Sequence, residues 1–269
     1  MTCQPDSLGS SVNQFFLVWR QQMASSAIAS KIPTGSRSSS TPLARSREAT
    51  PSRHFVWLGA GAALAFLVPY VLADRIGLQR DVYYGVYAAA VTSLVIGWSH
   101  DTEQPLRDMC ARHWKLAVVL GLIAAGAMAL IATRQDVSGP HPGGLTLIGS
   151  VVWRGVVYGA ADGMLLSAFP ILLVFAALKN TKLRRRAGGV IAVGAVAIIA
   201  SISMTAVYHA GYSDFRSSKL SKPVTGDLVW SIPTLATLNP IGAPIAHIGL
   251  HVSAVFHNYN SNLFLPPHH

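Results

Sequence analysis

Long apolar runs separated by short polar stretches make up most of the chain after residue 53. Four of these runs, at residues 55–73, 82–98, 116–132 and 187–209, contain no Asp, Glu, Lys or Arg. A helix needs roughly 20 apolar residues to cross about 30 Å of hydrocarbon, and each run is close to that length. The pattern therefore predicts a transmembrane helix at each of the four runs.

Two further apolar regions are interrupted. Residues 145–178 are mostly apolar but too long for one straight span, so we expect a surface or partly buried helix at 145–156 that leads into a span at 157–178. Pro170 is the expected kink in that span. Residues 227–257 contain Pro233, Pro240 and Pro244, which predict a broken pair of helices, one ending near residue 238 and one from 244 to 257.

Together these elements predict an all-α, polytopic transmembrane helical bundle of about six to seven spans at residues 54–258, followed by a short tail at 259–269. The composition agrees, because 51% of the 269 residues are hydrophobic and only 12% are charged, whereas soluble domains have about 25% charged residues. Residues 1–53 are rich in Ser and Arg, and we expect a disordered basic tail. Their poverty in acids is also typical of an organellar targeting segment, and a misplaced start codon is a further alternative.

The net charge is +10, and the distribution of the basic residues along the chain indicates how the protein is oriented in the membrane. Of the Lys and Arg residues, six precede the first span, three lie between the second and third, and five lie at 179–186. These fourteen fall on one side of the membrane if the N-terminus is cytoplasmic, as the positive-inside rule requires. We therefore expect a multi-pass protein of the plasma membrane with lipid as its partner. The basic segment 182–186 is interpreted as a headgroup anchor, so no nucleic-acid partner is expected.

Histidines inside the apolar segments are the candidate metal ligands. A charged residue at the bilayer centre costs about 2.5–3.5 kcal/mol on insertion scales, so such residues mark sites. His247 and His251 are one helical turn apart and share a face, and His209 ends the run at 187–209. Three histidines of this kind predict a zinc site with one position left for water. Hydrogen bonding across a helix interface and haem ligation are the alternatives.

Arg154 and Asp162 are the candidate catalytic residues. With Tyr158 they recur every four residues and form one polar stripe on the predicted helix. Asp162 is interpreted as a base, a metal ligand, an orienter of a ligand histidine, or one half of an ion pair with Arg154 or another base. Asp227 and Asn239 border the broken region and are expected to be helix caps.

The order of these motifs resembles the CPBP family, intramembrane metalloproteases that include CAAX prenyl endopeptidases and bacteriocin-processing enzymes. That family carries Glu-Glu-x-x-x-Arg, Phe-x-x-x-His and His-x-x-x-Asn/Asp in successive helices. The stretches that correspond here, over residues 145–257, are Gly149-Ser-Val-Val-Trp-Arg154-Gly155, Thr205-Ala-Val-Tyr-His209 and His247-Ile-Gly-Leu-His251. The resemblance implies a metal-dependent intramembrane protease that acts on a membrane peptide or protein.

This chain departs from the family pattern at the catalytic positions. Gly149 and Ser150 replace the paired glutamates, Thr205 replaces Phe, and His251 replaces Asn or Asp. The metal site is therefore expected to remain while proteolysis is lost or altered. Two other functions stay open on the residues alone: a non-catalytic membrane scaffold or binding protein, and a small transporter whose broken helices and intramembrane Asp line its path.

Overall fold

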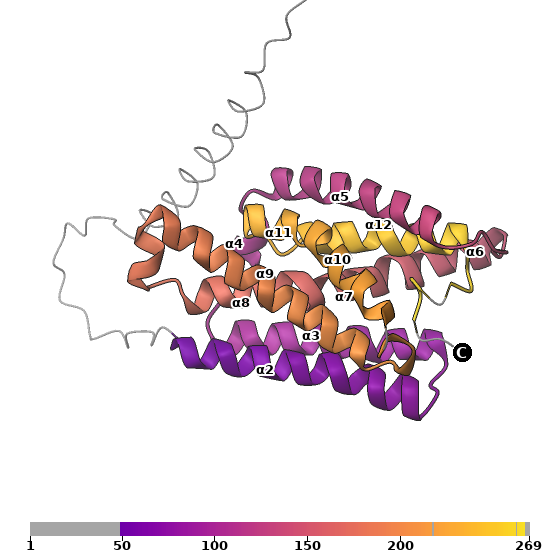
Figure 1. The fold of residues 1–269 in the computed structure, drawn as a ribbon, viewed down its shortest axis with the longest axis horizontal. Helices are drawn as coiled ribbons and strands as arrows, with labels where there is room; N and C mark the ends of the chain where they lie inside the picture. Colours follow the sequence, from indigo (N-terminus) through magenta and orange to yellow (C-terminus); the bar gives the residue numbers. More distant parts are fainter. Residues whose placement is uncertain (1–48, 217, 262, 267–269) are drawn as a thin grey trace, which may run out of the picture. The chain divides into compact units, whose positions relative to one another are not determined.

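The computed structural model describes residues 49–216, 218–261 and 263–266, and the predictions made for residues 1–48 lie outside this part. Every regular element of the described residues is a helix, which confirms the all-α prediction (Figure 1). The α-helices are α2 (Pro51–Val68), α3 (Arg80–Asp101), α4 (Leu106–Ala111), α5 (Trp114–Gln135), α6 (Gly144–Ser150), α7 (Tyr158–Gly163), α8 (Phe169–Ala177), α9 (Ala187–Ala210), α10 (Ser221–Trp230), α11 (Ile232–Thr237) and α12 (Gly242–His257). The π-helical segments are η1 (Pro69–Arg75), η2 (Val151–Val157) and η3 (Met164–Ala168), and the short 3-10 turns are η4 (Lys182–Arg185), η5 (Ser213–Phe215) and η6 (Ser218–Leu220).

Five continuous helices are long and apolar enough to cross a membrane: Pro51–Arg75, Arg80–Asp101, Trp114–Gln135, Gly144–Ala177 and Ala187–Ala210. Four of them contain the four uncharged runs of the sequence. Large apolar side chains such as Leu122 and Ile123 of α5 point outward, as a surface in contact with lipid requires. The chain is therefore a helical membrane protein, and the first helix within the described residues begins at residue 51, slightly before the expected domain boundary.

Contacts between loops define two ends of the bundle. At the first end, Arg53 at the start of α2 pairs with Asp101 at the end of α3. The side-chain amide of Asn239, just before α12, donates to the carbonyls of Cys110 and Arg112 at 2.8 and 2.6 Å, in the loop that leads to α5. The start of α12 therefore lies at the first end.

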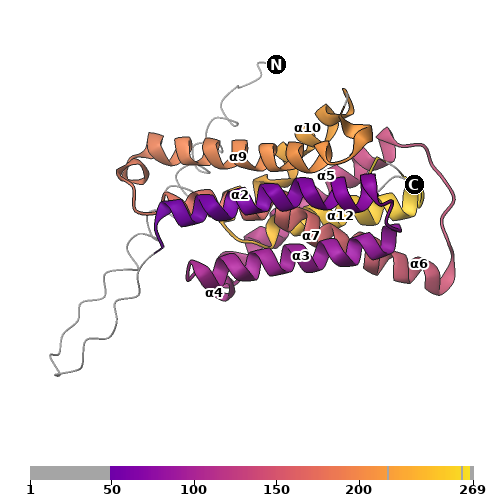
Figure 2. The same cartoon turned by 90° about the horizontal axis from the view of Figure 1, so that it is seen from below.

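The opposite end gathers the other set of loops. Arg216, after α9, pairs with Asp74 at 3.3 Å. His257, the last residue of α12, has its Nε2 atom 2.9 Å from the carbonyl oxygen of Asp136, just after α5. Because the loop with Arg216 leads into α10, the pair α10–α11 runs from this opposite end back to the first end. Helix α12 then runs from the first end to the opposite end. Five helices of the described residues have the length and hydropathy of a membrane span, so the number of six to seven spans stays a prediction. Figure 2 shows the long helices α2, α3 and α9 running side by side.

The prediction of a helix at 145–156 that is surface-exposed or partly buried is correct as to helix and partial burial, but its separation from the span at 157–178 is wrong, because residues 144–177 form one continuous helix. Two π-helical segments, η2 and η3, lie within it, and η3 ends just before Phe169-Pro170. Pro170 has no N–H to donate to the carbonyl of Leu166, and in a regular α-helix its ring would press on that carbonyl. The wider π turn removes this conflict, and the Leu166 carbonyl accepts a hydrogen bond of 3.0 Å from Ser201 of α9 instead.

Glycines let this long helix approach α12 at backbone contact. Gly155, Gly159 and Gly163 are spaced by four residues and face Val252, Ile248 and Pro244 of α12. A Cβ atom on Gly163 would lie 2.7 Å from Cα of Pro244 and 2.8 Å from the carbonyl oxygen of Ala243. Small residues at this spacing are a common basis of helix association in membranes, where close packing replaces the hydrophobic effect. The glycine stripe thus fixes the register of α12 against α7.

We expect Gly163→Ala to lower the midpoint of thermal unfolding in detergent, because the new methyl group meets the backbone of α12. Overpacking of this kind costs about 1–3 kcal/mol and outweighs the gain of up to about 1 kcal/mol in helix propensity. The matched control is Gly126→Ala in α5, where a Cβ meets nothing within 4 Å. An equal or higher midpoint in Gly163→Ala than in the control would contradict the close approach.

Candidate metal centre

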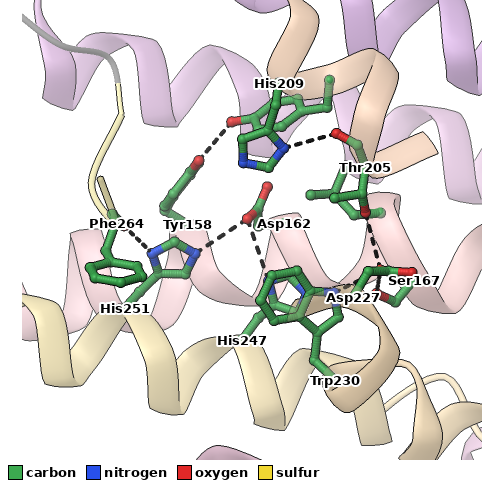
Figure 3. Close-up of polar contacts among 12 residues, drawn as sticks. Tyr158, Asp162, Ser167, Thr205, His209, Asp227, Trp230, His247, His251 and Phe264 are labelled. Atoms are coloured by element: carbon green, nitrogen blue, oxygen red, sulfur yellow. Dashed lines mark hydrogen bonds and ion pairs between the residues drawn. The ribbon is translucent and has the colours of Figure 1, made fainter. Parts of the chain in front are cut away.

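Asp162, His247 and His251 meet in the interior of the bundle. Asp162 is carried by α7, and both histidines are carried by α12, one turn apart. The Oδ2 atom of Asp162 lies 3.4 Å from Nδ1 of His247 and 3.2 Å from Nε2 of His251. The three residues are only 5%, 1% and 3% exposed. Figure 3 shows both rings of α12 directed at the same carboxylate.

The C-terminal segment fixes the orientation of His251. Its Nδ1 atom lies 2.8 Å from the backbone carbonyl oxygen of Phe264. A carbonyl only accepts, so Nδ1 carries a proton and the neutral ring presents the Nε2 lone pair to Asp162. The residues after α12 were predicted as a plain tail, yet Leu265 is fully buried. The apolar stretch at residues 263–265 was the one sequence signal for this packing.

Tyrosines hold the other side of Asp162. The hydroxyl of Tyr87, in α3, donates to Oδ1 of Asp162 at 3.0 Å, and the ring of Tyr158 packs 4.8 Å from that of His251. The Tyr158 hydroxyl is in turn 2.6 Å from that of Tyr208, which is 2.8 Å from that of Tyr212. Sequence reasoning placed Tyr158 on the polar stripe but missed Tyr87. Its only signal was the repeated tyrosines of an otherwise apolar helix.

His247 lacks the hydrogen bonds that a buried imidazole normally has. Neither ring nitrogen has a hydrogen-bond partner among the described residues, and both are inaccessible to solvent. The indole of Trp230 packs against the ring, with centroids 4.4 Å apart. Leaving buried polar atoms unpaired costs about 1–3 kcal/mol each. A ligand between His247 and Asp162 would remove this cost for Nδ1.

A cavity of about 250 Å³ opens beside the cluster. Its polar wall consists of Tyr158, Asp162, His209 and His251. Apolar side chains of α5, α10, α12 and the C-terminal segment form most of the remainder, among them Met128, Ile131, Val229, Leu250 and Phe264. Gln135 and Lys222 also line it, which places its mouth at the end of the bundle where α5 ends and α10 begins. The site is thus reachable from that end.

His209 lies across the cavity from α12. Figure 3 shows it on the far side of Asp162 from His247 and His251. Its Nδ1 atom is 2.8 Å from the carbonyl oxygen of Thr205, so Nδ1 donates and Nε2 keeps a lone pair. Among the described residues, the side chains with ligand atoms within 4.8 Å of one another are Asp162, His247 and His251, without His209. The role of His209 as a metal ligand stays a prediction.

The expected ion pair between Arg154 and Asp162 is wrong, and the histidines are the bases beside that carboxylate. Arg154 makes a bidentate pair with Asp81, with N–O distances of 2.8 Å to both oxygens, and its guanidinium lies 4.0 Å from the ring centroid of Tyr259. Eight residues along a helix separate Arg154 from Asp162 by about 12 Å. The structure therefore places Arg154 at the end of the bundle and away from the cluster.

Neither of the two predicted helix caps is confirmed. Asn239 lies in the turn between α11 and α12, where its Oδ1 atom accepts from the N–H of Ile241 at 2.9 Å, but Ile241 and not Asn239 is the N-cap of α12. The prediction for Asp227 is wrong, because this residue lies within α10 and is completely buried. Its Oδ1 atom accepts from hydroxyl groups of η3 and α9 and from the indole of Trp230 in its own helix, rather than from the N–H groups at a helix start.

The geometry of the cluster is suited to a metal ion. A tetrahedral zinc ion with ligands at about 2.0–2.1 Å has edges of about 3.3–3.4 Å. The two distances from Asp162 to the histidines, 3.2 and 3.4 Å, agree with such edges. The hydrogen bonds from His251 to a carbonyl and from Tyr87 to Asp162 are the kind that orient metal ligands. Two of the three edges therefore suit a metal ion, and the third, between the two histidine nitrogens, is no longer than 4.8 Å.

Comparison with known proteins adds no family to this picture: no protein-family model, no curated protein and no solved structure matches the chain.

A double-mutant cycle tests where Arg154 is paired. We expect Arg154→Met and Asp81→Asn to show a coupling free energy of unfolding of about 1 kcal/mol, since the two side chains share a charge-assisted pair. Arg154→Met and Asp162→Asn should add within about 0.5 kcal/mol, as distant sites do. Both cycles are measured by unfolding in detergent. Coupling to position 162 rather than 81 would contradict the observed pairing.

Proposed function

We propose that this chain is a zinc-dependent membrane hydrolase, with the metal held by Asp162, His247 and His251. The observation that carries the proposal is the pair of unsatisfied nitrogens on His247, one of them 3.4 Å from the Asp162 carboxylate. Imidazole nitrogen and carboxylate oxygen are common zinc ligands, and two histidines with one carboxylate make up several hydrolytic zinc sites. A cation between these groups would pair Nδ1 of His247, Nε2 of His251 and Oδ2 of Asp162, and would leave Nε2 of His247 as it is.

The protonation of His251 supports the same proposal. With its Nδ1 proton committed to Phe264, a neutral His251 directs the Nε2 lone pair at a carboxylate oxygen 3.2 Å away. Two lone pairs facing one another repel in a low-dielectric interior. A metal between them converts this repulsion into two bonds. A metal-free cluster requires an imidazolium at position 247 or 251 instead, which is the structural alternative that the experiment below distinguishes.

The cavity supports a reaction rather than a purely structural metal. Catalytic zinc sites keep one position open for water, whereas structural sites are closed by four protein ligands. A zinc ion bound here would supply Lewis acidity and a water of lowered pKa. His209 faces the same cavity with Nε2 free to accept a proton, so it would remove the proton from the attacking water. Tyr158, at the cavity wall, is already hydrogen-bonded to Tyr208, so its contribution would be to hold the ring of His251 in place.

A membrane peptide or protein is the substrate class that we propose. The resemblance to CPBP proteases rests on Arg154-Gly155, His209 and His247; of these, His209 lines the cavity and His247 belongs to the cluster. Asp162 and His209 would then do the work of the missing glutamates, as metal ligand and base respectively. Arg154 takes no part in this arrangement, because it is paired with Asp81. The chain is thus proposed as a divergent relative of that family.

The charge distribution supports an orientation in the plasma membrane. Nine of the fourteen Lys and Arg residues belong to the described chain, at positions 53, 107, 112, 115, 179, 182, 184, 185 and 186, and these lie at or beside the first end of the bundle. We therefore propose that this end, with the N-terminus, is cytoplasmic. The cavity mouth near Gln135 and Lys222 would then face the outer side. Its substrate would approach from the outer leaflet or from outside the cell.

Metal analysis of the purified protein is the first test. We expect about one zinc per chain, with loss of most of it in His247→Ala, His251→Ala and Asp162→Ala, since each substitution removes a ligand. His141→Ala, which removes an exposed loop histidine, is the matched control and should keep its zinc. Elemental analysis after gel filtration gives the stoichiometry, and circular dichroism verifies folding.

Two results of that analysis would contradict the proposal. Folded wild-type protein without any metal after expression in zinc-supplemented medium would leave the cluster as an imidazolium–carboxylate pair. Iron in place of zinc would point to redox chemistry, because two histidines and one carboxylate also form the usual site of non-haem iron enzymes.

The variant His209→Gln distinguishes the two possible roles of His209, general base and metal ligand. We expect this variant to retain its metal and the visible spectrum of the cobalt-substituted protein, because the three ligands remain. Peptide cleavage should fall by about 10²–10⁴-fold, the usual contribution of a general base. The measurements are cobalt absorption and cleavage of membrane peptides in detergent. A changed cobalt spectrum with lost metal would instead make His209 a ligand, as the sequence predicted.

A further inference from the structure

A second buried carboxylate, Asp227, lies among hydroxyl groups from three parts of the bundle. Its Oδ1 atom accepts from Ser167 of η3 and from Ser201 and Thr205 of α9, each at 3.1 Å. Ser231, between α10 and α11, lies 3.2 Å from the same atom. All these residues are 0% exposed. Figure 3 shows Ser167, Thr205 and Trp230 converging on Asp227.

One oxygen of this carboxylate is overcrowded and the other is unused. Oδ1 has four hydroxyl neighbours and also accepts from the indole Nε1 of Trp230 at 2.7 Å, although a carboxylate oxygen offers only about two lone-pair sites. Oδ2 is buried and has no hydrogen-bond partner. Hydrogen bonding alone therefore accounts poorly for this arrangement of oxygen atoms.

The hydroxyl of Ser201 likewise has more oxygen neighbours than it has protons to donate. It lies 3.0 Å from the Leu166 carbonyl, 3.1 Å from Oδ1 of Asp227 and 2.8 Å from Oγ of Ser231. Ser201 has one proton for three oxygen neighbours. The Leu166 carbonyl reaches this group because Pro170 gives it no α-helical donor. The result is a cage that contains a carboxylate, four hydroxyls and a backbone carbonyl.

No Lys, Arg or His of the described chain forms an ion pair with Asp227. A charged carboxylate without a counter-ion is costly at membrane depth. We propose that this oxygen cage, formed by Asp227 with Ser167, Ser201, Thr205, Ser231 and the Leu166 carbonyl, is a binding site for a sodium ion. Hard cations of this kind prefer oxygen ligands, whereas zinc and copper favour nitrogen and sulfur.

Charge and size select sodium among the hard cations. The cage holds one negative charge, so a monovalent ion neutralises it, whereas Ca²⁺ or Mg²⁺ would leave a net positive charge in an apolar interior. The oxygen–oxygen distances of 2.8–3.2 Å describe a compact shell. For comparison, octahedral edges are about 3.3–3.7 Å when an ion binds oxygen at 2.3–2.6 Å. Outward shifts of a few tenths of an ångström admit sodium, whereas the larger potassium ion needs more.

The sodium cage is separate from the metal centre but adjoins it. Trp230 donates its Nε1 proton to Asp227, and the same indole packs on His247. The ligand sets share no residue, so the sodium site does not depend on the hydrolase proposal. Sodium in the cage would hold η3, α9 and α10 together and fix Trp230 beside His247.

Direct binding of radioactive sodium tests the cage. The full chain is purified in detergent with EDTA and choline chloride, and ²²Na⁺ binding is measured by scintillation proximity. We expect saturable binding of about one ion per chain that choline and K⁺ displace at least tenfold less effectively than Na⁺. Asp227→Asn should abolish binding, and Thr205→Val should weaken it about tenfold by removing one oxygen ligand without changing side-chain size.

Matched variants make the result independent of folding defects. Thr205→Ser keeps the hydroxyl, so its affinity for sodium should be within about threefold of wild type. Thr133→Val removes an exposed α5 hydroxyl that bonds only within its own helix, so this variant should bind sodium as the wild type does. If Asp227→Asn does not fold, the Thr205 pair still decides. Absence of saturable binding in folded wild-type protein would overturn the proposal. Equal displacement by K⁺, or binding unchanged in Thr205→Val, would overturn it also.

Discussion

The contact between α12 and the long helix at Gly155, Gly159 and Gly163 is the constraint on which the rest of the structure depends. Backbones that touch at these glycines leave no freedom of register between the two helices. Asp162 precedes one of the glycines, so its carboxylate faces the turn of α12 that carries His247 and His251. A slide of one residue would turn both rings away from it. The metal centre is therefore a consequence of tight packing.

Most polar groups in the bundle interior are paired, for example Arg154 with Asp81 at the end of the bundle and Tyr87 with Asp162 further in. Among the described residues, the buried side-chain atoms without a hydrogen-bond partner are both His247 nitrogens, Oδ2 of Asp227, Oδ2 of Asp136 and the Tyr84 hydroxyl. Unpaired polar atoms are expensive where water is absent, and a bound ion would offset that cost. Each proposed ion site includes one of these residues, His247 or Asp227.

Trp230 links the two sites through a neutral side chain. Its indole bonds to Asp227 and packs on His247, while its apolar surface lines the cavity. The oxygen cage consists of hard oxygen ligands, whereas the histidine cluster offers borderline nitrogen ligands. The two adjacent sites would therefore select different cations through their donor atoms. The π-helical turn before Pro170 contributes to this difference, because it directs the Leu166 carbonyl toward Ser201.

The sequence by itself determined the fold class, since uncharged runs of membrane length have few alternatives to helices in lipid. It also predicted a site of His209, His247 and His251 with Asp162 nearby, because ionisable residues in apolar helices are rare, and the structure brings Asp162, His247 and His251 together. The partners of the polar side chains were decided only by tertiary structure. The contacts of Arg154 with Asp81, of His251 with Phe264 and of Asp227 with Ser167 join residues 73, 13 and 60 positions apart. Helical periodicity gives the face of each side chain but not the helix it meets, and that choice was made by the glycine contacts and the break at Leu238.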